Sequence, residues 1–142
     1  MFNPLYDTLF GCHIGREDTF LYLPDGQALS YQAFLATAAR YAGLLTELGL
    51  APGDRVAVQI ANSPQALAVY AACVQAGLVF LPLNTADTAD EVAYFIENSG
   101  AGIVLCDASR QAALAPIAAG CNAHVETVNS DGSGSFPDKA AS

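Results

Sequence analysis

The chain is 142 residues long, about the size of one domain, and carries 14 acidic against 5 basic residues for a formal net charge of −9. Nucleic acids and anionic membranes are bound by surfaces rich in lysine and arginine, so this balance excludes both as partners. No apolar run approaches the ~20 residues of a membrane span, and the start lacks the features of a signal peptide, which together predict a cytoplasmic protein.

The first third of the sequence predicts a helix, a β-hairpin and a longer helix. An Asn-Pro pair opens the first helix, which should cover Pro4–Phe10. Phe20–Leu23 and Gln27–Leu29 flank a Pro-Asp-Gly turn, which is typical of a hairpin. Ser30 can then cap a helix whose apolar residues recur at helical spacing until Gly49.

Four strands and three helices alternate between residues 55 and 128. Short β-branched or apolar runs predict the strands, and Ser63 and the capping box of Thr88 and Glu91 mark two helix starts. Pro116 should kink or break the last helix. The predicted strands are Arg55–Ile60, Leu78–Leu81, Ile103–Cys106 and Ala123–Val128, and the predicted helices are Gln65–Ala76, Thr88 to about Asn98, and Ser109–Ala119.

This alternation predicts a fold of the α/β class. Strand, helix, strand in strict succession gives a doubly wound parallel sheet of about four strands, flavodoxin-like, with right-handed crossovers and helices on both faces. The amino-terminal helix and hairpin should lie against this unit as additional pieces.

The run Leu78–Leu81 is the clearest candidate for a strand that leads into a binding loop. Gly77 ends the preceding helix, the run is wholly apolar and so should be buried on both faces, and Pro82 should end the ladder. Ligands in open α/β sheets bind at such strand exits, which makes Asn84 and Thr85 the candidate substrate-binding residues. The plainer interpretation, a strand that ends at a turn and binds nothing, stays open.

The residue pattern offers no metal site and no catalytic group. The cysteines are far apart, form no CxxC pair and have only two histidines as possible co-ligands, so we interpret all four as reduced, structural thiols: Cys12, Cys73, Cys106 and Cys121. No glycine-rich phosphate loop follows a strand, and no carboxylate pair or Ser-His-Asp set stands out. We therefore assign no catalytic, cofactor-binding or metal-binding residue.

Several motifs together resemble the opening stretch of the adenylate-forming enzymes, a superfamily of acyl-CoA synthetases, adenylation domains and luciferases. In chain order they are Leu29-Ser30-Tyr31, Pro52-Gly53-Asp54-Arg55-Val56-Ala57-Val58, Asn62-Ser63-Pro64 and Ala76-Gly77-Leu78-Val79-Phe80-Leu81-Pro82-Leu83-Asn84. Their order and spacing match across essentially the whole chain. Within the superfamily, the stretch from Pro82 to Asp107 is most similar to malonyl-CoA synthetases.

The resemblance implies an ATP-dependent acid–CoA ligase. Such an enzyme joins a carboxylate to AMP, with Mg²⁺ beside the ATP, and then transfers the acyl group to the thiol of CoA. Malonate or methylmalonate would be the acid. The phosphate loop and the lysine of the superfamily are not among these residues, so the resemblance implies an amino-terminal fragment of the large domain, which binds none of these cofactors alone and needs the missing carboxyl-terminal portion for activity.

The organisation of the chain leaves one alternative open. Residues 1–128 should form the α/β subdomain, and the Ser- and Gly-rich residues 129–142 a linker or disordered tail. Instead of a ligase fragment, the chain could be a standalone flavodoxin-like binding or scaffolding module. The helix Gln65–Ala76 favours the fragment, because it is apolar on nearly every side; such a surface needs a partner and could also drive self-association.

Overall fold

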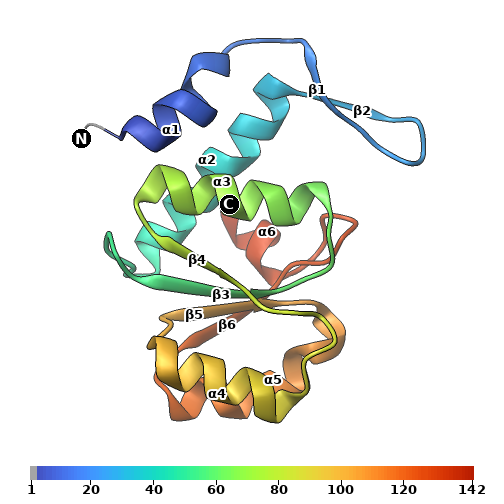
Figure 1. Ribbon diagram of the computed structural model, residues 1–142. Coiled ribbons are helices and arrows are strands. Elements are labelled where there is room, and N and C mark those ends of the chain that lie inside the picture. The colour runs from blue at the N-terminus through green and yellow to red at the C-terminus, as the bar shows by residue number, and fades with distance from the viewer. Residues whose placement is uncertain (1–2) are drawn as a thin grey trace.

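The computed structural model describes residues 3–142, and within them six strands and six α-helices form an α/β fold (Figure 1). The strands are β1 Thr19–Tyr22, β2 Ala28–Ser30, β3 Arg55–Gln59, β4 Val79–Pro82, β5 Ile103–Cys106 and β6 His124–Thr127. The α-helices are α1 Pro4–Leu9, α2 Tyr31–Glu47, α3 Pro64–Ala76, α4 Ala89–Ser99, α5 Gln111–Gly120 and α6 Ser135–Ala140, and the short 3₁₀ turns are η1 Gly11–His13 and η2 Ala108–Arg110.

The four later strands form one parallel sheet in the order β4-β3-β5-β6, as the sequence predicted. Val56 of β3 is in register with Phe80 of β4 on one side and with Ile103 of β5 on the other. Ile103 is in turn in register with His124 of β6. The antiparallel hairpin β1–β2 forms a separate sheet beside α2. The predicted α/β class and the doubly wound sheet are therefore confirmed.

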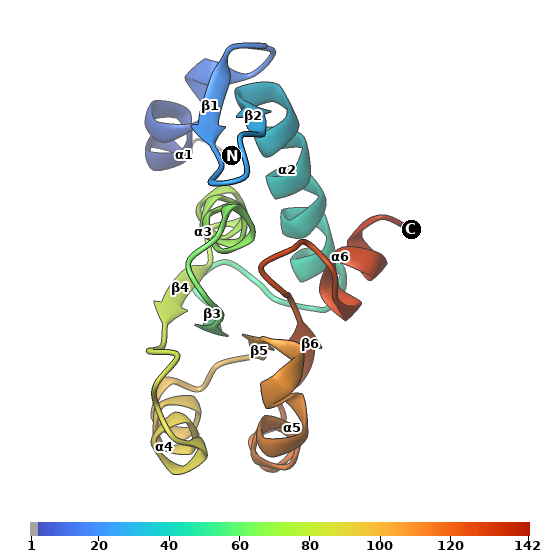
Figure 2. The same ribbon diagram turned by 90° about the vertical axis from the view of Figure 1, so that its right-hand side faces the viewer.

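Helices cover both faces of the sheet and bury two apolar cores (Figures 1 and 2). Helices α2, α3 and α6 lie on one face, where Phe34, Leu45 and Val56 belong to the larger core. Helices α4 and α5 lie on the other, where the smaller core includes Ile96 and Leu114. Alternate residues of each strand point to opposite faces, so one short strand supplies both cores.

Strand β4 differs from the expectation that it is buried on both faces. It lies at the edge of the sheet, and the side chain of Val79 is 46% exposed. Pro82 does not end the ladder but stays in register with Val58, and the Leu83 amide still donates to the Val58 carbonyl at 2.8 Å. A proline is tolerated here because its missing N–H falls on an edge strand, where the outer side has no neighbour to bond.

Helix α3 is buried on more than one side, as predicted. Ser63 caps its start by accepting from the amide of Ala66 at 3.2 Å, and Gly77 ends it with a φ of 72°. Every residue of α3 is buried or half-buried, because α1, α2 and the sheet pack around it. Its apolar surface is thus covered within this chain, so the helix does not favour a fragment over a standalone module.

Helix α5 is not broken by Pro116, contrary to one of the two outcomes that the sequence predicted. The α-helix runs from Gln111 to Gly120 with the proline inside it. Leu114 and Ala118 are fully buried on either side of Pro116, which is itself exposed. Packing of the buried face against the sheet therefore outweighs the loss of one helical hydrogen bond.

The prediction of a linker or disordered tail at residues 129–142 is wrong. Residues Ser135–Ala140 form α6, and Phe136 is completely buried, with its ring 4.9 Å from that of Tyr41 on α2. The buried carboxylate of Glu126 accepts from the Ser135 hydroxyl and from the Lys139 ammonium. The segment was misread because it is short and rich in glycine and serine, and its order depends on these contacts with distant parts of the chain.

Gly134 is the backbone position that makes this docking possible. Its φ of 132° lies in a region that only glycine adopts readily, and a Cβ there would lie 2.3 Å from the carbonyl oxygen of Thr127. The close approach lets the Ser135 hydroxyl accept from the Thr127 amide at 2.9 Å on the outer edge of β6. The tail thus covers part of an otherwise open sheet edge.

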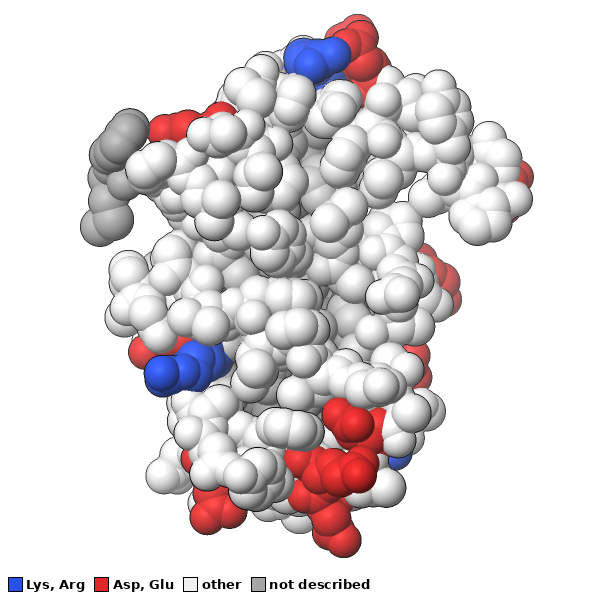
Figure 3. Space-filling model, viewed as in Figure 1, with Lys and Arg blue, Asp and Glu red and all other residues white. Residues whose placement is uncertain are grey.

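Charge is unevenly spread over the surface. Figure 3 shows a largely uncharged middle of the molecule in that view, with acidic side chains gathered at the end where α4 lies. Among residues 3–142 the ion pairs are Arg16–Asp18 and Lys139–Glu126. No helix among these residues is long and apolar enough to cross a membrane.

Candidate functional site

The carboxyl ends of four parallel strands meet at one edge of the sheet, and the loops that follow them form the candidate site. The loops begin after Gln59, Pro82, Cys106 and Thr127. Ligands in open parallel sheets bind at this edge, because the loops there can vary without disturbing the sheet.

A buried glutamine joins these loops. The side chain of Gln59 is 1% exposed, and its Nε2 donates to the carbonyl oxygens of Asn84 at 3.0 Å and Asp87 at 3.2 Å. Arg110 completes the arrangement: its Nε donates to Gln59 Oε1 at 3.3 Å and its Nη2 to the Asp87 carbonyl at 3.0 Å. We call these contacts the Gln59–Arg110 node; they fix the loop after β4 to β3 and to the turn after β5.

Asn84 and Thr85, the residues predicted to bind substrate, lie exposed in the loop that the node holds. One of the two polar atoms of the Asn84 side chain is already used, because its Oδ1 accepts from the amide of Ala86 at 2.9 Å. The backbone amide of Asn84 donates to Asp87 Oδ2 at 3.2 Å, which joins the residues on either side of Thr85 and Ala86. The Thr85 hydroxyl has no hydrogen-bond partner among residues 3–142 and is the more available of the two. The assignment of both to substrate remains a proposal.

The node itself was missed by sequence reasoning. Gln59 is the one uncharged polar residue of its strand, and Arg110 is a lone base in a polar turn 51 residues later. A polar side chain inside a buried strand needs a hydrogen-bond partner. The glutamine at the end of this strand was therefore the signal in the sequence that could have indicated such a contact. Its partner could not be named, because the strand order decides which turn lies opposite.

The described part of the chain holds no set of groups that would perform covalent chemistry at this edge. Cys106 is fully buried at the end of β5, and burial raises the pKa of its thiol to about 11, with the nearby Asp107 carboxylate adding to the rise and Arg110 opposing it. Burial likewise raises the pKa of the Cys73 thiol to about 12. Among residues 3–142 no three His, Cys, Asp or Glu side chains are grouped as a metal site.

We expect the thiols to divide into two classes of reactivity. The thiolate is the reactive form, so Cys73 and Cys106 should remain unmodified by a disulfide reagent at pH 8, whereas the exposed Cys12 and the half-buried Cys121 should react. Counting modified thiols by mass before and after unfolding checks these two classes, and rapid labelling of Cys73 in the folded protein would contradict them.

The raised pKa values of Cys73 and Cys106 also make the stability depend on pH, because the folded state favours the protonated thiols. Their contribution to the stability is present below the ordinary pKa of 9.0 and is lost as the pH rises through about 11 and 12.

Gln59→Leu should lower the free energy of unfolding by about 1–3 kcal/mol, because the carbonyls of the loop and the Arg110 guanidinium lose their buried partner. Gln111→Leu is the matched control: the same substitution at an exposed position of α5 should change the stability by less than about 0.5 kcal/mol. Urea unfolding followed by circular dichroism measures both. Equal effects of the two substitutions would show that the node does not stabilise the fold.

The chain is similar to known proteins of one family. Residues 14–140 match the AMP-binding enzyme family. Feruloyl-CoA synthase of Amycolatopsis sp is 38% identical over 95 residues, which are 67% of this chain and 19% of that protein. The long-chain-fatty-acid–CoA ligase FadD13 of Mycobacterium tuberculosis is 36% identical over 77 residues, which are 54% of this chain and 15% of that protein.

The solved structures agree with the sequence relatives. Apo MatB from Rhodopseudomonas palustris superposes with a TM-score of 0.93 and 42% identity, covering 99% of this chain and 28% of that one. The same protein with ATP bound gives the same values. The chain thus spans about a fifth of the length of the curated feruloyl-CoA synthase and just over a quarter of MatB.

Proposed function

Because this chain belongs to the AMP-binding enzyme family, we propose that it forms the amino-terminal part of an ATP-dependent acid–CoA ligase. Such a ligase joins a carboxylate to AMP with release of pyrophosphate, and the CoA thiol then displaces AMP to give the thioester. The observation that carries the proposal is the similarity to feruloyl-CoA synthase, at 38% identity, and to the long-chain-fatty-acid–CoA ligase FadD13, at 36% identity. The match over residues 14–140 also favours a ligase over a standalone binding or scaffolding module.

In this proposal the chain frames the active site and holds no reacting group. ATP, CoA and Mg²⁺ would be bound by the remaining part of the protein; the ATP-bound structure of MatB supports ATP as the nucleotide. Thr85 would lie toward the substrate at the carboxyl edge of the sheet. Asn84 would shape the loop that carries Thr85, through its hydrogen bond from the Ala86 amide. The Gln59–Arg110 node would keep this loop in place during turnover.

The acid in this proposal is malonate, or methylmalonate. The resemblance of the stretch from Pro82 to Asp107 to malonyl-CoA synthetases supports this choice. The four unpaired cysteines suit the reducing cytoplasm. Exposed apolar side chains such as Tyr94, 65% exposed, and Phe95, 40% exposed, would contact the rest of the protein or a second copy.

The test compares the isolated chain with the full-length protein that contains it. The isolated chain should catalyse no exchange of pyrophosphate into ATP with malonate, because the groups that would stabilise the transferring phosphates lie outside it. The full-length protein should catalyse exchange that depends on malonate. Clear exchange by the pure isolated chain would overturn the assignment of all catalytic groups to the remaining part of the protein.

A further inference from the structure

The loops that follow the four parallel strands are joined by side chains, and the Gln59–Arg110 node is only part of this connection. The four connections leave the sheet together on the right-hand side of Figure 1, where β3, β4, β5 and β6 end. The node links the loop after β4 to β3 and to η2, the turn after β5. Asn129, in the loop after β6, extends the connection to the fourth strand.

Both polar atoms of the Asn129 side chain are hydrogen-bonded. Its Oδ1 accepts from the amide of Ala108, the first residue of η2, at 2.9 Å. Its Nδ2 donates to the Ser133 hydroxyl at 3.0 Å, and its backbone amide donates to the Ser133 carbonyl at 2.8 Å. The loop after β6 is therefore closed on itself, and it holds the start of η2 through the side chain of Asn129.

The turn η2 carries this contact to the node. Arg110 is the last of its three residues and donates to the Asp87 carbonyl at 3.0 Å. Within residues 3–142 Arg110 forms no ion pair, so its guanidinium holds neutral acceptors in place instead of neutralising a carboxylate. Asp87 closes the loop that carries Thr85, because its amide donates to the Asn84 carbonyl at 3.0 Å. A shift of η2 would therefore move the anchor of that loop.

We propose that Asn129 is a positioning residue for the loop of residues 84–87, and that it acts through η2 and Arg110. The hydrogen bonds form an unbroken series from the loop after β6 to the loop after β4. Such a series of contacts can couple two segments that do not touch each other. The consequence for catalysis rests on the proposed function, in which Thr85 lies toward the substrate. The coupling between the two loops does not depend on that function.

Amide hydrogen exchange of the 142-residue chain, measured by NMR, tests the coupling. Asn129→Ala should speed exchange of the Ala108 amide about fivefold, which corresponds to one hydrogen bond of about 1 kcal/mol. The amides of Ala86 and Asp87 should exchange about twofold faster or more, since twofold is about 0.5 kcal/mol, the lower end of such coupling energies. The amide of Val69, fully buried inside α3, should not change, whereas a general loss of stability would speed it too.

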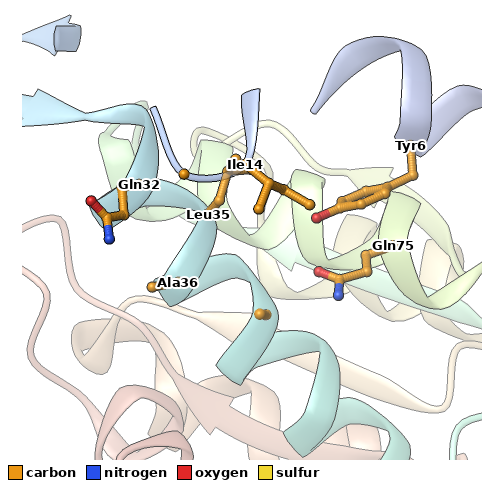
Figure 4. A pocket seen from close by; sticks show the side chains of 8 residues that line it. Tyr6, Ile14, Gln32, Leu35, Ala36 and Gln75 are labelled. Carbon is orange, nitrogen blue, oxygen red and sulfur yellow. The ribbon is translucent and has the colours of Figure 1, made fainter. Parts of the chain in front are cut away.

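Three further variants show whether the effect follows the proposed series of contacts. Asn129→Asp keeps the acceptor for the Ala108 amide, so it should keep exchange of the loop amides slow. Arg110→Met interrupts the series, and Asn129→Ala added to it should no longer affect the loop. The control is Gln32→Ala, which removes an exposed side-chain amide at the pocket between α1, α2 and α3 (Figure 4) and should change none of these rates.

The proposal is overturned if Asn129→Ala speeds exchange at Ala108 alone, or if its effect on residues 86 and 87 persists in full with Arg110→Met. The comparison with Asn129→Asp decides the matter even if Arg110→Met fails to fold. In the full-length protein, Asn129→Ala should raise the KM for malonate about twofold or more with little change in kcat, and Asn129→Asp should restore it.

The activity of the full-length protein separates this proposal from the proposed function. An unchanged KM in an active protein would overturn the positioning role of Asn129 and leave the ligase assignment intact. A full-length protein that releases no AMP with any acid would contradict the ligase assignment, and the exchange rates of residues 86 and 87 would then decide the coupling by themselves.

Discussion

Phe136→Ala should lower the free energy of unfolding by about 3–5 kcal/mol, the range found for phenylalanines removed from a packed core. The ring is completely buried, lies 4.9 Å from the ring of Tyr41 and belongs to the larger core. The loss is a large fraction of the total stability of about 5–15 kcal/mol that is usual for a domain of this size. Urea unfolding followed by circular dichroism measures the change.

The matched control is Phe95→Ala, which removes the same side chain from a position that is 40% exposed on α4. It should cost far less, because much of the ring is already in contact with water and leaves no closed cavity behind. If the two substitutions destabilise the protein equally, α6 does not pack as described and residues 129–142 are the loose tail that their composition predicted.

Local signals in the sequence predicted most of the fold. Ser30, Ser63 and the Thr88–Glu91 capping box all make the hydrogen bonds that their spacing indicated. These motifs act over three or four residues, so their chemistry can be judged without knowing the rest of the structure. The alternation of strands and helices then leaves few possible topologies, and the parallel sheet is among them.

Features that depend on contacts between distant segments were predicted poorly. The apolar run in β4 is typical of a central strand, yet β4 is an edge strand, and Phe80 is covered by a contact with Tyr70, their rings 5.4 Å apart. The order of strands in a sheet is not written in any single strand. Helix α6 was missed for the same reason, since a six-residue helix with Pro137 inside it is stable only against the core.

The candidate site shows the same division. The exit of β4 was predicted as the binding loop, and the structure places Asn84 and Thr85 there, exposed at the carboxyl edge of the sheet. The Gln59–Arg110 node could not be predicted, because β3 and the turn after β5 become neighbours only through the strand order. Sequence reasoning therefore located the loop but not the contacts that hold it.

The full-length protein should prefer malonate over acetate by about 100-fold or more in kcat/KM. Malonate carries a second carboxylate, which would cost several kcal/mol to bury without a partner. A site that accepts it must hold a cation, and arginine fits best because its guanidinium bonds a carboxylate through two parallel hydrogen bonds. Acetate would leave that buried cation unpaired, and sites built for a polar group discriminate strongly against analogues that lack it. The cation would lie outside these 142 residues.

The account is tested most directly by the specificity constants of the full-length protein for a panel of acids, measured by AMP release with ATP and CoA present. The panel is malonate, methylmalonate, acetate, hexanoate and benzoate, compared at equal concentrations. We predict the highest constant for malonate or methylmalonate, with equal amounts of AMP and acyl-CoA formed. A higher constant for hexanoate or benzoate would contradict the dicarboxylate assignment, and AMP release with none of the acids would contradict the acid–CoA ligase itself.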